Sequence, residues 1–333
     1  MNPCASALLV LALLPQRCPR RASVHPRATQ PVLCRQPRVD IERATGSSLH
    51  EAAEFFVEAF WLSSTTYGTV KVSERERRAL AGQMADDLEQ RYGTSWGKRS
   101  ASGGRLFPAR LLLARDDTSG AIVGCVGIEA ALLNPLEGGI IGSAGADALL
   151  RMEIALMLPS EQARTSAAFE VGGLTALCAE LLPEYTAVGL LTNLAVAPSA
   201  RRQGLGGLLC EYCDAGCAEW ALMGTALQVE ESNAAARALY ERAGFDEIRR
   251  ESNASALRLQ PGAASAVSAL LLTSANDELL QNVPSTLVTM AKAASARRAA
   301  AAGSEGSSTA GAAERQGQQS RSTSTSGQDS IRS

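Results

Sequence analysis

The chain has 333 residues, of which 46% are hydrophobic and 20% charged, and its formal net charge is −2. This length allows one or two domains with a sizeable core. Without residues 1–39 the chain has 26 basic and 34 acidic residues, and this mildly acidic balance does not indicate the basic face that nucleic-acid binding needs, so we expect no nucleic-acid partner. The eight cysteines are irregularly spaced, which excludes a disulfide framework. The chain has only two histidines, His25 and His50, so a Ser-His-Asp or Cys-His hydrolase would have few candidates for its catalytic histidine.

The first 38 residues differ in composition from the rest of the chain. They hold six arginines and no acidic residue, and they are rich in Pro, Ala and Ser. This composition is typical of an organelle transit peptide, so we expect residues 1–38 to direct the protein to the plastid stroma, with the mitochondrion as the alternative. The apolar run at 5–14 makes a secretory signal a rival, but no basic residue precedes it. It is too short to span a membrane, and no other segment is a candidate span.

The N-terminal half of the remaining chain alternates strand and helix patterns. The predicted elements are a strand at 38–43, helices at 48–61 and 73–92, a Gly/Ser loop at 93–104, and strands at 109–115 and 121–130. In the first helix, Ser48 is the predicted N-cap, because Glu51 follows at the spacing of a capping box. The two strands are joined by a hairpin turn at 116–120.

The C-terminal half begins with an insertion at 131–186, which contains three prolines and is expected to be partly ordered. The elements predicted after it are a buried strand at 187–196, a helix at 204–220, a strand at 225–229, a helix at 233–243, and strands at 245–250 and 256–259. One domain at 39–260 follows from this series. Residues 261–302 are Ala-rich and predicted to be a helical extension, and 303–333 a disordered tail.

A glycine-rich loop, RRQGLGG at 201–207, lies between the buried strand and the helix that follows it. Glycines 204 and 206 let the backbone approach a ligand closely, and the free amides and partial positive charge of a helix N-terminus suit a phosphate. The loop lacks the Lys-Ser/Thr pair of a P-loop, and its glycine spacing does not fit the dinucleotide fingerprint. The sequence therefore predicts a pyrophosphate site of another kind.

A second segment follows the next strand and carries Asn233 and Tyr240. Taken alone, an Asn at a helix start is usually an N-cap, and a Tyr on a helix is usually a half-buried core residue. The two segments together resemble the GNAT acetyltransferase superfamily. The likeness consists of N-L-A-V-x-P-x-x-[QR]-x-x-G-x-[GA] at 193–206 and L-x-V-x-x-x-N-x-x-A-x-x-L-Y-x-x-x-G-F at 227–245.

The likeness extends over residues 38–260 through the flanking strands, and TNLAVAPSARRQGLG is most similar to the plastid GNAT N-acetyltransferases of plants and algae. It implies a mixed α/β domain, whose central, mostly antiparallel twisted sheet is splayed at the cofactor strand and flanked by helices. It also implies acetyl-CoA as cosubstrate and no metal. The implied cofactor-binding residues are Leu194, Ala195 and Val196 on the strand, Arg201, Arg202, Gln203, Gly204, Leu205, Gly206 and Gly207 in the loop, and Asn233 and Tyr240 beyond it. Tyr240 is also the implied general acid.

One position departs from the related bacterial N-terminal acetyltransferases. Gln228 stands where those enzymes carry a glutamate base, and a carboxamide cannot take a proton. Glu129, Glu230 and Glu231 are candidate bases acting through water. An α-amine, whose pKa is about 7.7–8.0, needs no base, whereas a lysine amine with a pKa near about 10.4 needs more help.

The predicted function is acetyl transfer to protein N-terminal α-amines, lysine ε-amines or both, in the plastid. A protein or peptide amine is thus the expected partner, and the oligomeric state is left open. Two alternatives remain, namely acetylation of a small arylalkylamine or polyamine, and a CoA-binding regulatory role without catalysis. Cys210, Cys213 and Cys217 share one helix face and are interpreted as buried thiols rather than metal ligands, because no second ligand cluster is present.

Overall fold

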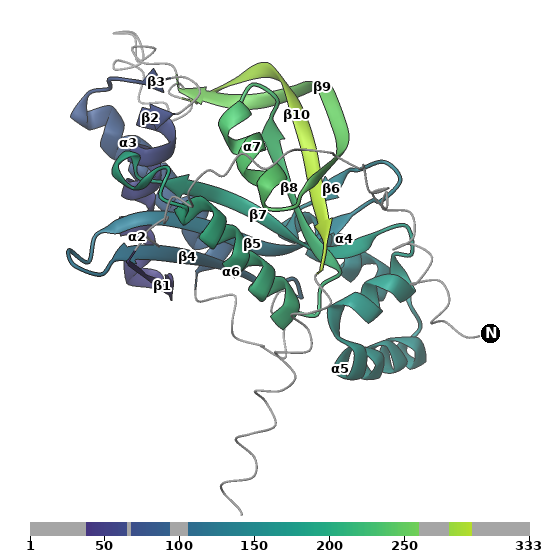
Figure 1. Ribbon diagram of the computed structural model, residues 1–333. Helices are drawn as coiled ribbons and strands as arrows, with labels where there is room; N and C mark the ends of the chain where they lie inside the picture. The colour runs from purple at the N-terminus through teal and green to yellow at the C-terminus, as the bar shows by residue number, and fades with distance from the viewer. Residues whose placement is uncertain (1–37, 65–67, 94–105, 260–279, 295–333) are drawn as a thin grey trace, which may run out of the picture. The chain divides into compact units, whose positions relative to one another are not determined.

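The computed structural model describes residues 38–64, 68–93, 106–259 and 280–294, and all of its elements lie within these ranges (Figure 1). Residues 1–37 of the predicted leader and the predicted tail at 303–333 lie outside the described residues. Within the described ranges, no helix combines the length and the apolar character that crossing a membrane would require.

The core is an eight-stranded sheet in the order β1-β4-β5-β7-β8-β10-β9, with β6 paired to β5 (Figure 1). Its strands are β1 Val39–Arg43, β4 Ala109–Asp116, β5 Ile122–Leu133, β6 Ile140–Ile141, β7 Thr186–Val196, β8 Gly224–Glu230, β9 Asp246–Leu259 and β10 Leu280–Ala293. Of the pairs in this sheet, only β7 and β8 run parallel. Strands β2 Ser63–Ser64 and β3 Gly68–Thr69 form a separate hairpin. The predicted mixed fold with a mostly antiparallel sheet is confirmed.

Helices cover both faces of the sheet (Figure 1). Helix α2 Gly46–Phe56, its π-helical continuation η1 Val57–Leu62, and α3 Glu74–Tyr92 lie on one face. Helices α6 Leu205–Glu219 and α7 Ala234–Arg242 lie on the other, after the 3-10 turn η3 Pro198–Ala200. The insertion at 131–186 contains the end of β5, strand β6, and helices α4 Ser143–Leu156 and α5 Pro159–Leu181.

Strand alternation explains how β5 serves both layers. Cys125 packs in the cluster under α2 and α3, whereas Val126 and Ile128 pack in the cluster under α6. Successive side chains of a strand point to opposite faces, so a continuous apolar run is the pattern of a strand that is covered on both sides.

The N-cap of the first helix lies three residues before the predicted one. Thr45 is the N-cap of α2, and its backbone N–H donates to Ser48 Oγ at 2.8 Å. Ser48 therefore occupies the third helical position, where its hydroxyl takes the part that the glutamate plays in a capping box. The predicted helix at 73–92 is confirmed, with Ser73 as N-cap and Gly93 at the C-terminal end.

The largest correction concerns the segment after residue 260. The prediction of a helical extension is wrong for Leu280–Ala293, which form β10 between β8 and β9. The sheet thus extends to Ala293, and the two short strands predicted at 245–250 and 256–259 are one strand, β9. Pro284 is tolerated because β8 pairs only with residues from Leu287 onward, so β10 has an open edge at the proline.

Candidate active site

The sheet opens between β7 and β8. These strands pair at two positions, Gly189 with Thr225 and Leu190 with Ala226, and within the described residues no further pair joins them. Beyond this point β7 stays paired with β5 and β8 with β10. The backbone groups of β7 that face β8 are therefore open to a ligand, and an extended ligand can satisfy them as an additional strand would.

A bulge turns β7 at the mouth of this opening. The register between β5 and β7 shifts between Cys125 and Gly127, and Asn193 has a φ of +50°. Asn tolerates the left-handed region better than most residues do, so its presence there is chemically sensible. The predicted cofactor residues Leu194, Ala195 and Val196 follow directly after the bulge.

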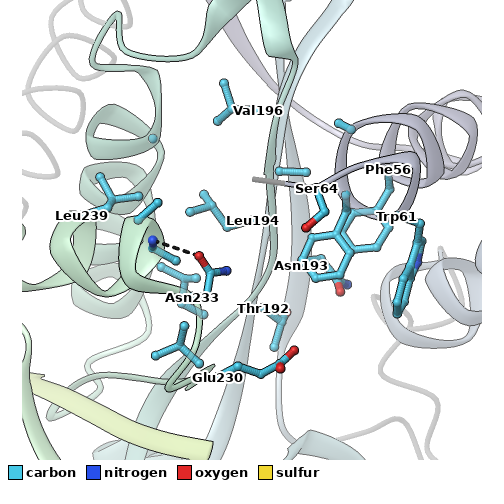
Figure 2. A pocket seen from close by; sticks show the side chains of 18 of the residues that line it. Phe56, Trp61, Ser64, Thr192, Asn193, Leu194, Val196, Glu230, Asn233 and Leu239 are labelled. Atoms are coloured by element: carbon cyan, nitrogen blue, oxygen red, sulfur yellow. Dashed lines mark hydrogen bonds between the residues drawn. The ribbon is translucent and has the colours of Figure 1, made fainter. Parts of the chain in front are cut away.

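A cavity of about 840 Å³ extends through the opening to both faces of the sheet. Figure 2 shows Leu239 and Asn233 on one side of β7 and Phe56, Trp61 and Ser64 on the other. All of the predicted cofactor residues except Gln203 line this cavity. Its volume lies within the range of about 300–1,000 Å³ that is common for small-molecule sites.

The glycine loop has the conformation that close approach to a phosphate requires. Gly204 is the N-cap of α6 with a φ of +88°, and Arg202 has a φ of +65°. The amides of the first turn of α6 thus open toward the cavity, as an anion needs. Gln203 turns away, because its Nε2 donates to the Ser199 carbonyl at 2.9 Å. These residues fit an extended ligand that carries a pyrophosphate.

Asn233 and Tyr240 lie on α7, across the opening from β7. Asn233 is the N-cap of α7, and its Oδ1 accepts the Ala236 N–H at 3.1 Å (Figure 2). The carboxamide NH₂ is the group that this geometry leaves for a ligand. Tyr240 is 7% exposed, and its ring meets Phe245 edge to face at 5.8 Å. Burial raises the pKa of Tyr240 well above its usual value, so its hydroxyl keeps the proton at neutral pH.

The candidate bases occupy different environments. Gln228 and Glu230 line the cavity, and Glu230 pairs with Arg258, whose Nη1 lies 2.6 Å from Oε1. Glu231 lies outside the lining and pairs with Arg250. The fourth candidate, Glu129, is 5% exposed and also lies outside the lining. It accepts a hydrogen bond from the Ser143 hydroxyl, and its Oε1 is 3.9 Å from Arg91 Nη1.

Sequence reasoning missed the aromatic wall that the end of α2 and η1 contribute. Phe60 stacks on Phe56 with ring centroids 4.8 Å apart and meets Trp61 edge to face at 5.1 Å, and all three line the cavity. Phe60 is nevertheless 41% exposed. In the sequence these residues are indistinguishable from the apolar face of an ordinary helix, so no local signal marked them.

The predicted buried thiols are confirmed. Cys210, Cys213 and Cys217 are each at most 2% exposed, and they lie on the face of α6 that packs into the core. Burial raises the pKa of the Cys210 thiol to about 12, so it is protonated and unreactive at neutral pH.

A buried hydrogen-bonded group supports the bulge from the face opposite α7. The Tyr92 hydroxyl lies 2.7 Å from Thr192 Oγ1 and accepts the Asn193 Nδ2 donor at 3.2 Å. Gly127 makes room for it, because a Cβ at that position would lie 2.2 Å from Tyr92 Oη. A side chain from the end of α3 thus fixes the turn of a strand that lies 100 residues later.

We therefore expect Gly127→Ala to lower the free energy of unfolding by about 1–3 kcal/mol, since the added methyl must displace the Tyr92 hydroxyl. Gly82→Ala is the matched control, because nothing lies within 4 Å of a Cβ there. Inside helix α3 that change should raise stability by about 0.5–1 kcal/mol. Urea denaturation of both variants provides the measurement, and equal effects would show that the Tyr92 contact does not constrain β7.

Comparison with known proteins agrees with this geometry. Residues 166–247 match the family model of the acetyltransferase (GNAT) domain, which covers α6, β8 and α7 together with the opening between β7 and β8. No curated protein sequence matches the chain.

The chain also matches several solved structures, at low sequence identity and with TM-scores below 0.5. The ribosomal-protein-S18-alanine N-acetyltransferase from Escherichia coli is 15% identical, with 77% of this chain and 94% of that chain covered and a TM-score of 0.36. A phosphinothricin acetyltransferase from Sinorhizobium meliloti in complex with acetyl-CoA is 12% identical, with 77% and 89% covered and a TM-score of 0.39. Arabidopsis thaliana NAA60 in complex with acetyl-CoA is 11% identical, with 77% and 98% covered and a TM-score of 0.36.

The splayed parallel pair, the glycine loop at the start of α6 and the matched domain model define an acyltransferase. Residues 166–247 are similar to the acetyltransferase (GNAT) domain, and the activity that this similarity supports is acetyl-CoA-dependent N-acetyl transfer.

Proposed function

We propose that the protein acetylates the N-terminal α-amines of proteins or peptides. The observation that carries this proposal is the state of the carboxylates around the cavity. Among the described lining residues, only Asp87 and Glu230 are acidic, and they pair with Arg91 at 3.1 Å and Arg258 at 2.6 Å. Gln228, which stands on β8 at the fork, has no basic atom. Such a site suits an acceptor whose amine is partly unprotonated at neutral pH without help from a base.

The pKa values of amines distinguish the possible acceptors. At pH 8 about half of an α-amine with a pKa near about 8 is neutral, whereas less than about 1% of a lysine amine with a pKa near about 10.4 is neutral. Only the neutral form has the lone pair that attacks a thioester. A site without a strong base therefore favours an α-amine by roughly two orders of magnitude over lysine or an alkylamine.

The residues can then be assigned to the steps of the transfer. The loop at 202–207 and the N-terminus of α6 bind the pyrophosphate, and β7 from Leu194 to Val196 pairs with the pantetheine arm and positions the thioester carbonyl. The amine nitrogen bonds to the acetyl carbon as the carbon–sulfur bond breaks. Tyr240 donates its hydroxyl proton to the departing thiolate, and the proton that the amine loses passes to water, from which the Tyr240 phenolate is protonated again.

Kinetics on matched peptides test the proposal. The full chain is assayed with acetyl-CoA and one peptide sequence in two forms, one with a free N-terminus and acetylated lysines, the other with a blocked N-terminus and free lysines. We expect kcat/KM to be about 100-fold higher for the first form at pH 7.5. For that form, kcat/KM should rise with pH to a plateau above about pH 8. It should not decline toward pH 10, because the pKa of Tyr240 is raised.

Other outcomes would favour other functions. Preference for the lysine form would identify a lysine acetyltransferase with a base that acts through water. Turnover of arylalkylamines or polyamines without turnover of either peptide would indicate a small-amine enzyme. Binding of acetyl-CoA with no turnover of any amine would favour the regulatory alternative.

We also propose that the protein acts in the plastid stroma. This rests on residues 1–38, with six arginines and no acidic residue. Fusing these residues to a fluorescent protein and expressing the fusion in plant or algal cells provides the test, and mitochondrial or secretory fluorescence would contradict the proposal.

A further inference from the structure

The side chain of Arg201 makes hydrogen bonds that are not expected of an arginine that binds a phosphate. Its Nε donates to the Val196 carbonyl at 3.1 Å, and its Nη2 donates to the carbonyls of Ala59 and Ser63 at 2.9 and 2.7 Å. Val196 ends β7, Ala59 belongs to η1, and Ser63 begins β2. One guanidinium thus connects the end of the cofactor strand to Ala59 and Ser63, which precede Arg201 by 142 and 138 residues.

The accepting carbonyls lie where backbone groups need an external donor. The last carbonyls of a helix have no partner within the helix, and they carry the partial negative charge of its dipole. At the end of η1 a cationic side chain supplies both the missing hydrogen and the complementary charge. π-Helical turns are rare, and those that occur are often found at functional sites. The attachment of η1 to the glycine loop by a charged residue therefore indicates a functional role for η1.

The segment that Arg201 contacts, η1 and β2, forms the wall of the cavity on the side opposite α7. Trp61 and Ser64 lie on this wall (Figure 2). Phe60 lines the same cavity and directly follows Ala59, one of the two carbonyl residues. Arg202, immediately after Arg201, is exposed and lies at the start of the glycine loop, on the side predicted for the pyrophosphate. Both arginines line the cavity, but the guanidinium of Arg201 is hydrogen-bonded to three backbone carbonyls, whereas the side chain of Arg202 is exposed.

We propose that Arg201 is a positioning residue which fixes the acceptor wall of η1 and β2 to the cofactor loop, and that Arg202 is the arginine that contacts the phosphates. Arg201 then sets the affinity for the acceptor amine, and binding of acetyl-CoA at the loop orders the acceptor wall. The assignment of the wall to the acceptor rests on the proposed function.

Paired substitutions separate the two arginines. Arg201→Gln and Arg202→Gln are compared in the full chain by equilibrium binding of acetyl-CoA and by steady-state kinetics with the free-N-terminus peptide. For Arg201→Gln we expect the KM of the peptide to rise about tenfold and the Kd of acetyl-CoA to stay within about twofold. For Arg202→Gln we expect the reverse. Arg201→Lys keeps the charge and should recover part of the peptide KM.

Hydrogen exchange measured by mass spectrometry gives a readout that does not depend on the acceptor. In the wild type, acetyl-CoA should slow exchange across residues 57–64, and in Arg201→Gln this protection should be lost while protection of the loop at 202–207 remains. Loss of acetyl-CoA affinity in Arg201→Gln, with unchanged exchange at 57–64, would overturn the proposal and make Arg201 a phosphate ligand. If Arg201→Gln fails to fold, Arg201→Lys is used for the same comparison.

The two readouts also separate this inference from the proposed function. If no peptide is acetylated by the wild type but acetyl-CoA protects 57–64 through Arg201, the α-amine proposal fails and the positioning role stands. If peptides are acetylated and neither their KM nor the exchange at 57–64 responds to Arg201→Gln, the positioning role fails and the α-amine proposal stands.

Discussion

Replacing Tyr240 with phenylalanine is expected to lower kcat at least about 100-fold while leaving the Kd of acetyl-CoA within about twofold. Proton transfer by a positioned side chain contributes about 10²–10⁴-fold to a rate, and this substitution removes the only atom able to donate the proton at that position. The ring itself stays, so its edge-to-face contact with Phe245 is preserved. A strongly lowered kcat with retained cofactor binding is the result expected for a missing acid, and rapid-quench kinetics would locate the loss in the chemical step.

Tyr212→Phe is the matched control for this prediction. Tyr212 lies on α6 and is 43% exposed, in contrast to the buried Tyr240. Its replacement should change neither kcat nor acetyl-CoA binding. A Tyr240→Phe enzyme with the kcat of the wild type would remove Tyr240 as the acid and leave solvent as the proton source.

The parts of the fold that could be predicted are those whose signals are local. Strand β7 is a continuous apolar run followed by a glycine loop. Helix α7 has Asn233 as its N-cap, and Gly244, with a φ of +90°, follows its C-cap. Caps and turns of this kind depend on neighbouring residues only. Strand β10 could not be predicted, because its alternation is weak and an Ala-rich context and Pro284 argue against a strand. Its conformation is imposed by the edges of β8 and β9, which are distant in sequence.

The same distinction holds within the site. Loop residues were predictable because glycines and a helix start are visible in a short segment. The support for β7 was not predictable, since Tyr92 reaches Thr192 across 100 residues and no short pattern encodes that contact. The pairing of Glu230 with Arg258 could likewise not be predicted. The proposed function depends on it, because a paired carboxylate is a poor base and the acceptor amine must then be partly neutral by itself. Chemistry that depends on burial and long-range pairing needs the structure.

Replacing Gly206 with tryptophan is expected to raise the Kd of acetyl-CoA by more than about 100-fold. Gly206 lies in the first turn of α6, between the cavity and α7, and a Cβ there would already lie 3.0 Å from Leu239 Cδ2. A single methyl can be accommodated, because its neighbour is the end of a flexible side chain. An indole cannot, and it must enter the space between the loop and α7 that the pyrophosphate and pantetheine are proposed to occupy.

Two alanine variants show whether the effect comes from occupied space. Gly206→Ala should change acetyl-CoA affinity only a few-fold, because the Leu239 side chain can move. Gly82→Ala, in helix α3 and outside the cavity lining, has nothing within 4 Å of the new methyl, so it should bind acetyl-CoA as the wild type does and gain about 0.5–1 kcal/mol of stability from the better helix former. Isothermal titration measures the affinities and urea denaturation the stability. Tight binding by a folded Gly206→Trp variant would mean that the cofactor does not lie against the start of α6. The opening between β7 and β8 would then have to be filled from the η1 side instead.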